Sequence, residues 1–199
     1  MGDYFQTIVD TEARAEEAPE LAARLISKLI EDGIIAAAKD SLVYTGAEGP
    51  GDHGHGRGPN WVNALHADEE WEFSGGVVPL VGRETFLEGQ GESEAEYAKC
   101  PRCGERTTFI DYPESFEADQ ELWEPFGQAL EAWQEGGSGE VACPSCAVPS
   151  PVDEWTWASD FAMGALALDF WNWPQLSDAF VERVGRELGH RVVLISGKL

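Results

Sequence analysis

The chain has 199 residues and a mass of 21.7 kDa, and its 37 acidic residues against 13 Lys and Arg give a formal charge of −24. A hydrophobic fraction of 43% excludes a chain that is disordered throughout. The acidic balance argues against direct nucleic-acid binding, because phosphate contacts normally use Lys or Arg. The start of the chain lacks a signal-peptide pattern, and no run approaches about 18 apolar residues. We therefore expect a cytoplasmic protein without a membrane span.

The first 40 residues predict a strand, a helix and a second strand in succession. Residues 4–9 are rich in the aromatic and β-branched types that strands favour. From Pro19 onwards, apolar residues recur at helical spacing until Gly33, which suits the position just after a helix. Residues 34–38 form an apolar run that predicts the start of the second strand, which continues more weakly to Tyr44.

The C-terminal segment repeats this plan. Residues 165–171 are a short apolar run, which predicts a strand. A Ser–Asp capping signal then begins a helix that ends at Gly189, and residues 190–195 predict a final strand. Two β-α-β units predict an α+β fold, a four-stranded ferredoxin-like βαβ–βαβ sandwich with both helices on one face.

The middle of the chain lacks the β-α-β pattern of the two ends. We expect residues 1–96 and 159–199 to form the α+β body, with 45–76 as an irregular Gly-, Pro- and His-rich region and a short strand at 77–81. Residues 97–158 are predicted to be an inserted unit. Within it, Phe126, Ala129, Leu130 and Trp133 lie at i, i+3, i+4 and i+7, which predicts an inserted helix.

Four cysteines occur in this insertion as two C-x₂-C pairs, Cys100 with Cys103 and Cys143 with Cys146. Such pairs let four thiolates converge on one tetrahedral ion, the geometry that Zn²⁺ prefers. Each pair has the form Cys-Pro-x-Cys and resembles a knuckle of a zinc ribbon, a resemblance that covers these cysteines and their flanks only. It implies a structural Zn²⁺, although a four-cysteine shell also suits iron.

Three other interpretations of the cysteines are weaker. Structural disulfides are disfavoured because the chain shows no secretion signal. A thioredoxin-like redox pair is disfavoured because two matching pairs are present and neither begins an obvious helix after a strand. A catalytic zinc ion is disfavoured because a Cys₄ shell leaves no open position for water or substrate.

The acidic residues are concentrated in the middle of the chain, where residues 61–140 hold 19 acids and 4 bases. One interpretation is a solvated surface. The other is a docking surface for a basic protein partner, steered by the long-range field. We therefore predict a non-enzymatic zinc-binding protein that acts as an adaptor or an immunity-type inhibitor. Its candidate partner-binding residues are Asp68, Glu69, Glu70, Glu92, Glu94 and Glu96.

Two alternatives remain open. The first is a metal-dependent enzyme that uses Asp52, His53, His55 and His66, although the Gly-rich stretch that holds the first three of them favours a surface loop. The second is a regulator that binds nucleic acid or imitates its charge. A small basic spot at Arg102 and Arg106 beside the first cysteine pair would serve nucleic-acid binding, but acidic residues surround it.

Overall fold

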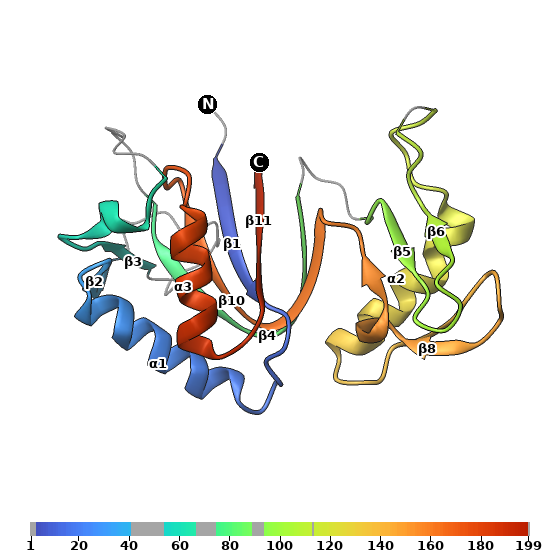
Figure 1. Ribbon diagram of the computed structural model, residues 1–199, viewed down its shortest axis with the longest axis horizontal. Coiled ribbons are helices and arrows are strands. Elements are labelled where there is room, and N and C mark those ends of the chain that lie inside the picture. The colour runs from blue at the N-terminus through green and yellow to red at the C-terminus, as the bar shows by residue number, and fades with distance from the viewer. Residues whose placement is uncertain (1–2, 41–53, 67–74, 89–93, 113, 199) are drawn as a thin grey trace. The chain divides into compact units, whose positions relative to one another are not determined.

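The computed structural model describes residues 3–40, 54–66, 75–88, 94–112 and 114–198 (Figure 1). These residues form a mixed α/β structure with three α-helices and mostly antiparallel sheets. The chain divides into a terminal unit, Met1–Gly82 with Gly164–Leu199, and a central unit, Arg83–Met163. The central unit extends beyond the predicted insertion at 97–158, because Phe161 and Met163 belong to its hydrophobic core.

The terminal unit is built on a sheet of six strands in the order β11-β1-β10-β4-β3-β2. β1 pairs antiparallel with both β10 and β11, which places Thr7 opposite Asp169 on one side and Ile195 on the other. β4 and β10 are long strands that continue from this unit into the central unit. The strands are β1 (Tyr4–Asp10), β2 (Ile35–Asp40), β3 (Gly54–Arg57), β4 (Val77–Leu87), β10 (Phe161–Trp171) and β11 (Val192–Lys198).

Two helices, α1 (Ala18–Glu31) and α3 (Asp178–Leu188), share the core of this unit. Their apolar stripes pack with Ile8 and Leu168, which are paired across β1 and β10. The Ser177 hydroxyl accepts the N–H of Phe180 at 3.2 Å and so caps α3. The helix–strand pattern predicted at both ends of the chain is thus confirmed.

The sheet is larger than the predicted four-stranded sandwich, because β3 and β4 lie between β10 and β2. The prediction that residues 45–76 are irregular is wrong for Gly54–Arg57, which form β3, and for Trp61–Ala64, which form a 3₁₀ turn, η1. β3 has no apolar pattern of its own. It is held by pairing with its neighbours, and the Nδ1 atom of His55 lies 2.8 Å from the Ala36 carbonyl oxygen.

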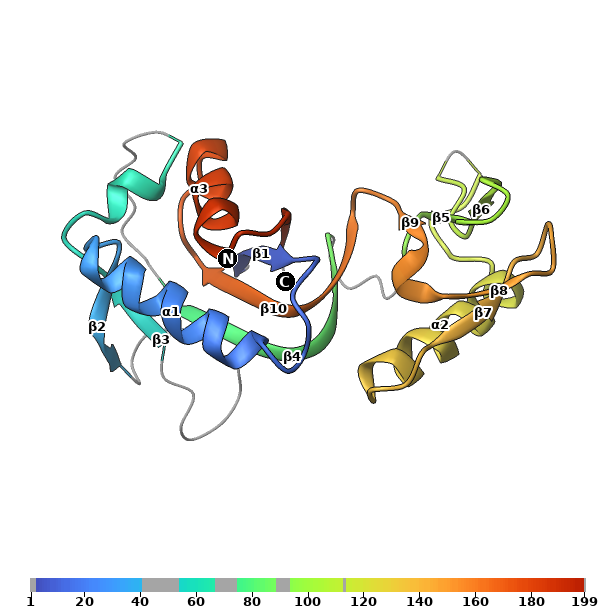
Figure 2. The same cartoon turned by 60° about the horizontal axis from the view of Figure 1, so that its bottom comes forward.

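The central unit consists of two small antiparallel sheets and one long helix, α2, which lies beside the β7–β8 hairpin in Figure 2. One sheet has three strands in the order β6-β5-β9, and the other is the hairpin. The elements are β5 (Tyr97–Lys99), β6 (Arg106–Thr108), α2 (Gln120–Gln134), β7 (Glu140–Ala142), β8 (Pro149–Pro151), a 3₁₀ turn η2 (Val152–Glu154) and β9 (Thr156–Trp157).

The predicted apolar stripe of α2 is confirmed, and the helix begins six residues before Phe126. Phe126 is fully buried, and its ring centroid lies 4.9 Å from those of both Phe109 and Trp155. The side chain of Asp119 accepts the N–H of Glu121 at 3.0 Å and so caps the helix. No helix in the described part of the chain is long and apolar enough to cross a membrane.

Candidate metal centre

Each cysteine pair lies in the turn of a short hairpin, and the two turns have equivalent backbone hydrogen bonds. In the β5–β6 turn, the Gly104 N–H donates to the Cys100 carbonyl and the Cys100 N–H donates to the Glu105 carbonyl, both at 3.0 Å. In the β7–β8 turn, the Ala147 N–H donates to the Cys143 carbonyl at 2.8 Å. The two knuckles are therefore local structural copies of each other.

These turns bring the four sulfur atoms together. All four lie within 4.8 Å of one another, with Cys100 Sγ 3.9 Å from Cys146 Sγ and Cys103 Sγ 3.8 Å from Cys143 Sγ. A tetrahedral ion with Zn–S bonds of about 2.3 Å requires sulfur–sulfur distances of about 3.8 Å. The cysteines are free thiols, and the cluster fits a single metal ion.

Burial differs within each knuckle, because the first cysteine is buried and the second is more accessible. Cys100 and Cys143 are 3% and 2% exposed, whereas Cys103 is exposed. Backbone N–H groups point at the buried sulfurs, from Arg102 to Cys100 at 3.3 Å and from Ser145 to Cys143 at 3.4 Å. Such donors favour the thiolate form that a metal ion needs.

The thiols do not ionise together without an ion. Desolvation acts to raise the pKa of Cys100, but hydrogen bonds from the backbone N–H groups of Cys103 and Arg102 lower it to about 7. The N–H of Glu105 acts to lower the pKa of Cys103, whereas desolvation and hydrogen bonds with the neighbouring thiols raise it to about 12. A bound dication would hold all four groups as thiolates.

A side chain from the first knuckle links the two hairpins independently of the sulfurs. Arg102 Nε donates to the Ser150 hydroxyl at 3.2 Å, and Arg102 Nη2 lies 2.9 Å from a Glu154 carboxylate oxygen. Ser150 is fully buried on β8, so this bond fixes the first knuckle against the second hairpin. No local sequence pattern indicates this link, because the partner residues are about 50 positions apart.

The candidate partner-binding residues are only partly described. Asp68, Glu69, Glu70 and Glu92 lie outside the described residues. Glu94 and Glu96 are described, and both are half-buried. Glu94 accepts from Gln120 at 3.3 Å, and Glu96 forms an ion pair with Arg106 at 2.7 Å.

The residues of the alternative enzyme site do not form a second metal cluster in the described part of the chain. Asp52 and His53 lie outside it, His66 is exposed, and His55 is 4% exposed with Nδ1 at the Ala36 carbonyl. Among the described residues, only the four cysteines form a group of three or more side chains that could hold an ion.

A buried carboxyl group in the terminal unit is not among the site residues predicted from the sequence. Asp169 is 7% exposed and accepts hydrogen bonds from the Thr7 hydroxyl at 2.7 Å and from the indole N–H of Trp171. An acidic residue within the apolar run 165–171 is the signal that could have indicated it.

The fold and the site together define a mixed α/β protein with a four-cysteine cluster that can hold a metal ion. No protein family, curated protein or solved structure matches the chain.

Proposed function

We propose that the protein holds one structural Zn²⁺ through Cys100, Cys103, Cys143 and Cys146 and acts by binding a basic protein partner, without catalysing a reaction. The observation that supports this proposal best is the convergence of four sulfurs within 4.8 Å of one another. Four thiolates complete a tetrahedral shell, so a zinc ion there has no position for water or substrate.

We also propose a ferredoxin-like topology for the terminal unit and a zinc-ribbon-like one for the cysteine hairpins. Strands β11, β1, β10 and β2 follow one another in the order of a ferredoxin-like sheet, and β4 and β3 are added between the last two. The two cysteine hairpins have the plan of a zinc ribbon, with α2 inserted between them. We regard the chain as a ferredoxin-like body that carries a zinc-ribbon-like unit.

The charge of the central unit supports a basic partner. Residues 83–163 hold 18 acids against 4 bases, and two of those bases, Arg102 and Arg106, are already paired with carboxylates. α2 exposes Glu121, Glu124 and Glu131 and contains no basic residue. A field of one sign accelerates association with a partner of opposite charge. An adaptor or an immunity-type inhibitor in the cytoplasm would use such a surface.

The metal is tested by elemental analysis of the purified chain. We expect one zinc per chain, lost in Cys100→Ser. It should be retained in Ser145→Ala, which changes a residue of the second cysteine turn without removing a ligand. Iron would reveal itself by visible absorption of its thiolate complex. Stoichiometric iron, or a metal content that Cys100→Ser leaves unchanged, would contradict the zinc assignment.

The partner is tested by retention of proteins from a lysate on the immobilised chain at low and high salt. We expect a basic protein to be retained at low salt only, because the Debye length falls from about 10 Å at 0.1 M to about 3 Å at 1 M. The double variant Glu121→Gln/Glu124→Gln should weaken retention, while Glu182→Gln/Glu187→Gln on α3 is the matched control. No basic protein at either salt concentration would refute the proposal.

A further inference from the structure

The strand β11 forms an edge of the sheet in the part of the chain that the structure describes. The Thr11 N–H donates to the Arg191 carbonyl at 3.2 Å, and these two residues lie opposite each other one position beyond the last pair of the β1–β11 ladder, Asp10 with Val192. In an antiparallel ladder, hydrogen-bonded pairs alternate with pairs that do not exchange hydrogen bonds. The backbone N–H and C=O groups of Leu194 and Ser196 therefore point away from β1, toward the position of a further strand.

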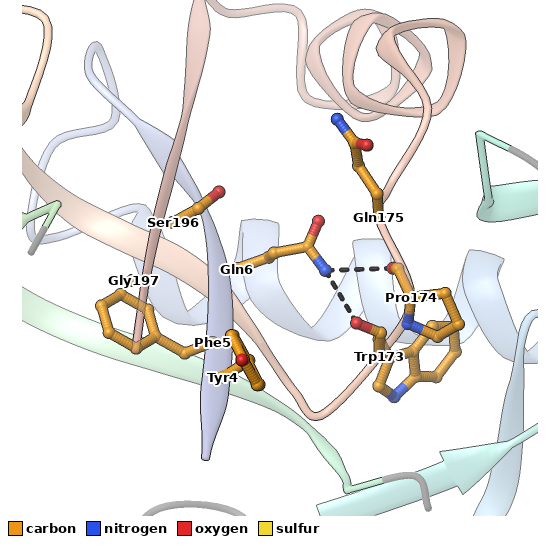
Figure 3. A pocket seen from close by; sticks show the side chains of 8 residues that line it. All are labelled: Tyr4, Phe5, Gln6, Trp173, Pro174, Gln175, Ser196 and Gly197. Atoms are coloured by element: carbon orange, nitrogen blue, oxygen red, sulfur yellow. Dashed lines mark hydrogen bonds between the residues drawn. The ribbon is translucent and has the colours of Figure 1, made fainter. Parts of the chain in front are cut away.

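A cavity of about 320 Å³ adjoins the end of this strand (Figure 3). Its wall comes from Tyr4 and Gln6 of β1, from Trp173 and Pro174 of the connection before α3, and from Ser196 and Gly197 of β11. None of the described residues that line it is charged. The volume is at the lower end of the range for ligand pockets and suits one large side chain.

The polar group at the base of the cavity is already satisfied. Gln6 Nε2 donates to the carbonyls of Trp173 and Pro174 at 3.1 and 3.0 Å, as the dashed lines in Figure 3 show. Gln6 Oε1 accepts the N–H of Leu176 at 2.8 Å. The amide thus fixes the wall, and the aromatic and proline surfaces beside it favour an uncharged, apolar occupant.

We propose that β11 binds an extended peptide of another protein as an additional strand, and that the cavity takes one large apolar side chain of this peptide. Strands lie about 4.8 Å apart, and the small residues Ser196 and Gly197 let a side chain of the added strand reach across β11. Backbone hydrogen bonds supply affinity in this mode, and the pocket supplies specificity.

The charge of β11 and its flanking residues indicates which kind of peptide would bind there. Residues 190–198 contain three basic residues and no acidic residue, in a chain of net charge −24. His190 is paired with the carboxylate of Asp10 at 2.8 Å, so Arg191 and Lys198 at the two ends of the strand carry the argument from charge. The peptide that fits is therefore uncharged along the strand and acidic at its flank. A second copy of this chain is disfavoured, because two chains of net charge −24 repel each other. This site is separate from the proposed acidic docking surface and takes the opposite charge.

The probe is a phage-displayed library of random decapeptides, selected on the full zinc-loaded chain. We expect selected peptides to carry a large apolar residue and an acidic flank. Ser196→Pro removes one outward N–H without touching the ladder to β1, so binding should weaken about fivefold or more. Ser196→Ala keeps both the N–H and a small side chain, and it should bind more tightly than Ser196→Pro by at least that factor. Tyr4→Ala, which removes one wall of the cavity, should also weaken binding.

Amide hydrogen exchange gives a readout that does not depend on any variant. With a selected peptide bound, exchange at Leu194 and Ser196 should slow at least tenfold relative to the free chain. Peptides that are rich in Lys and Arg, bind Ser196→Pro normally and dissociate at high salt would support the acidic surface and overturn the β11 site. Unchanged exchange at both amides, or a dimer formed through β11, would also overturn it.

Discussion

At the scale of single residues, Asp169 stands out as a carboxyl group buried in the middle of β10. Burial raises its pKa to about 6, although the hydrogen bonds from Thr7 and Trp171 act to lower it. In the unfolded chain an aspartate titrates near 3.9. Folding therefore requires either protonation of Asp169 or the burial of its charge, depending on the pH.

We expect this group to destabilise the folded protein as the pH rises from about 4 to about 6. In that window the folded state holds the Asp169 proton and the unfolded state has released it, so the free energy of unfolding falls with rising pH. The difference of about two pKa units corresponds to about 3 kcal/mol above pH 6.

Asp169→Asn should remove this dependence, because an amide stays neutral and can still bond to Thr7 and Trp171. Urea unfolding at pH 5 and pH 7.5 measures how the free energy of unfolding changes with pH. Asp178→Asn, on the exposed start of α3, is the control. The stability advantage of Asp169→Asn over the native chain should grow with pH. An advantage that is the same at both pH values would refute the assignment.

At the scale of elements, the two knuckles have the same turn but different residues at its left-handed position. Gly104 has φ 76°, and the equivalent Ala147 has φ 58°. A left-handed backbone costs an L-residue roughly 1–2 kcal/mol, whereas glycine adopts it freely. The first knuckle is therefore relaxed at this position, and the second is strained.

Exchanging these two residue types should shift stability in opposite directions. Gly104→Ala should lower the free energy of unfolding by about 1 kcal/mol, and since nothing lies within 4 Å of the added methyl group, the whole effect is backbone strain. Ala147→Gly should raise it by a similar amount. Urea unfolding of the zinc-loaded variants measures both, and shifts of the same sign would show that the knuckles are not equivalent.

At the scale of the whole molecule, the two units have separate hydrophobic cores. The core of the terminal unit includes Leu25, Phe170 and Val184 and contains no cysteine. The core of the central unit surrounds Phe126 and includes Cys100 and Cys143. Metal ligands are thus part of one core only, which links the stability of the central unit to the ion.

Removal of the metal should therefore unfold the central unit selectively. A structural zinc ion contributes about 10–16 kcal/mol of apparent binding free energy in small modules at neutral pH. Chelation, Cys100→Ser or Cys143→Ser should abolish amide protection across residues 126–133 of α2. Protection of β1 and α3 should persist, because their core lies in the terminal unit.

Hydrogen exchange of the chelated chain tests whether the central unit unfolds selectively, with Ser145→Ala as the control variant. Protection retained in α2 would show that the ion does not order the central unit. Loss of protection in β1 and α3 as well would show that the two units fold as one.

The sequence determined the features that depend on near neighbours in the chain. The helices α1, α2 and α3 follow from apolar residues at a 3.6-residue period with Ser177 and Gly189 at the ends of the last one. The cysteine cluster follows from spacing, because a C-x₂-C turn can place two sulfurs on one ion wherever it lies in the fold.

The tertiary structure decided the features that depend on pairing between distant segments. β3, with the sequence Gly-His-Gly-Arg, has no side-chain period, and it becomes a strand through its partners β2 and β4. The burial of Asp169 against Thr7 and the position of β11 at the end of the sheet, among the strands that the structure describes, likewise arise from strand order. Hydrogen bonds between backbones are available to every sequence, so local residue pattern does not specify which strands they join.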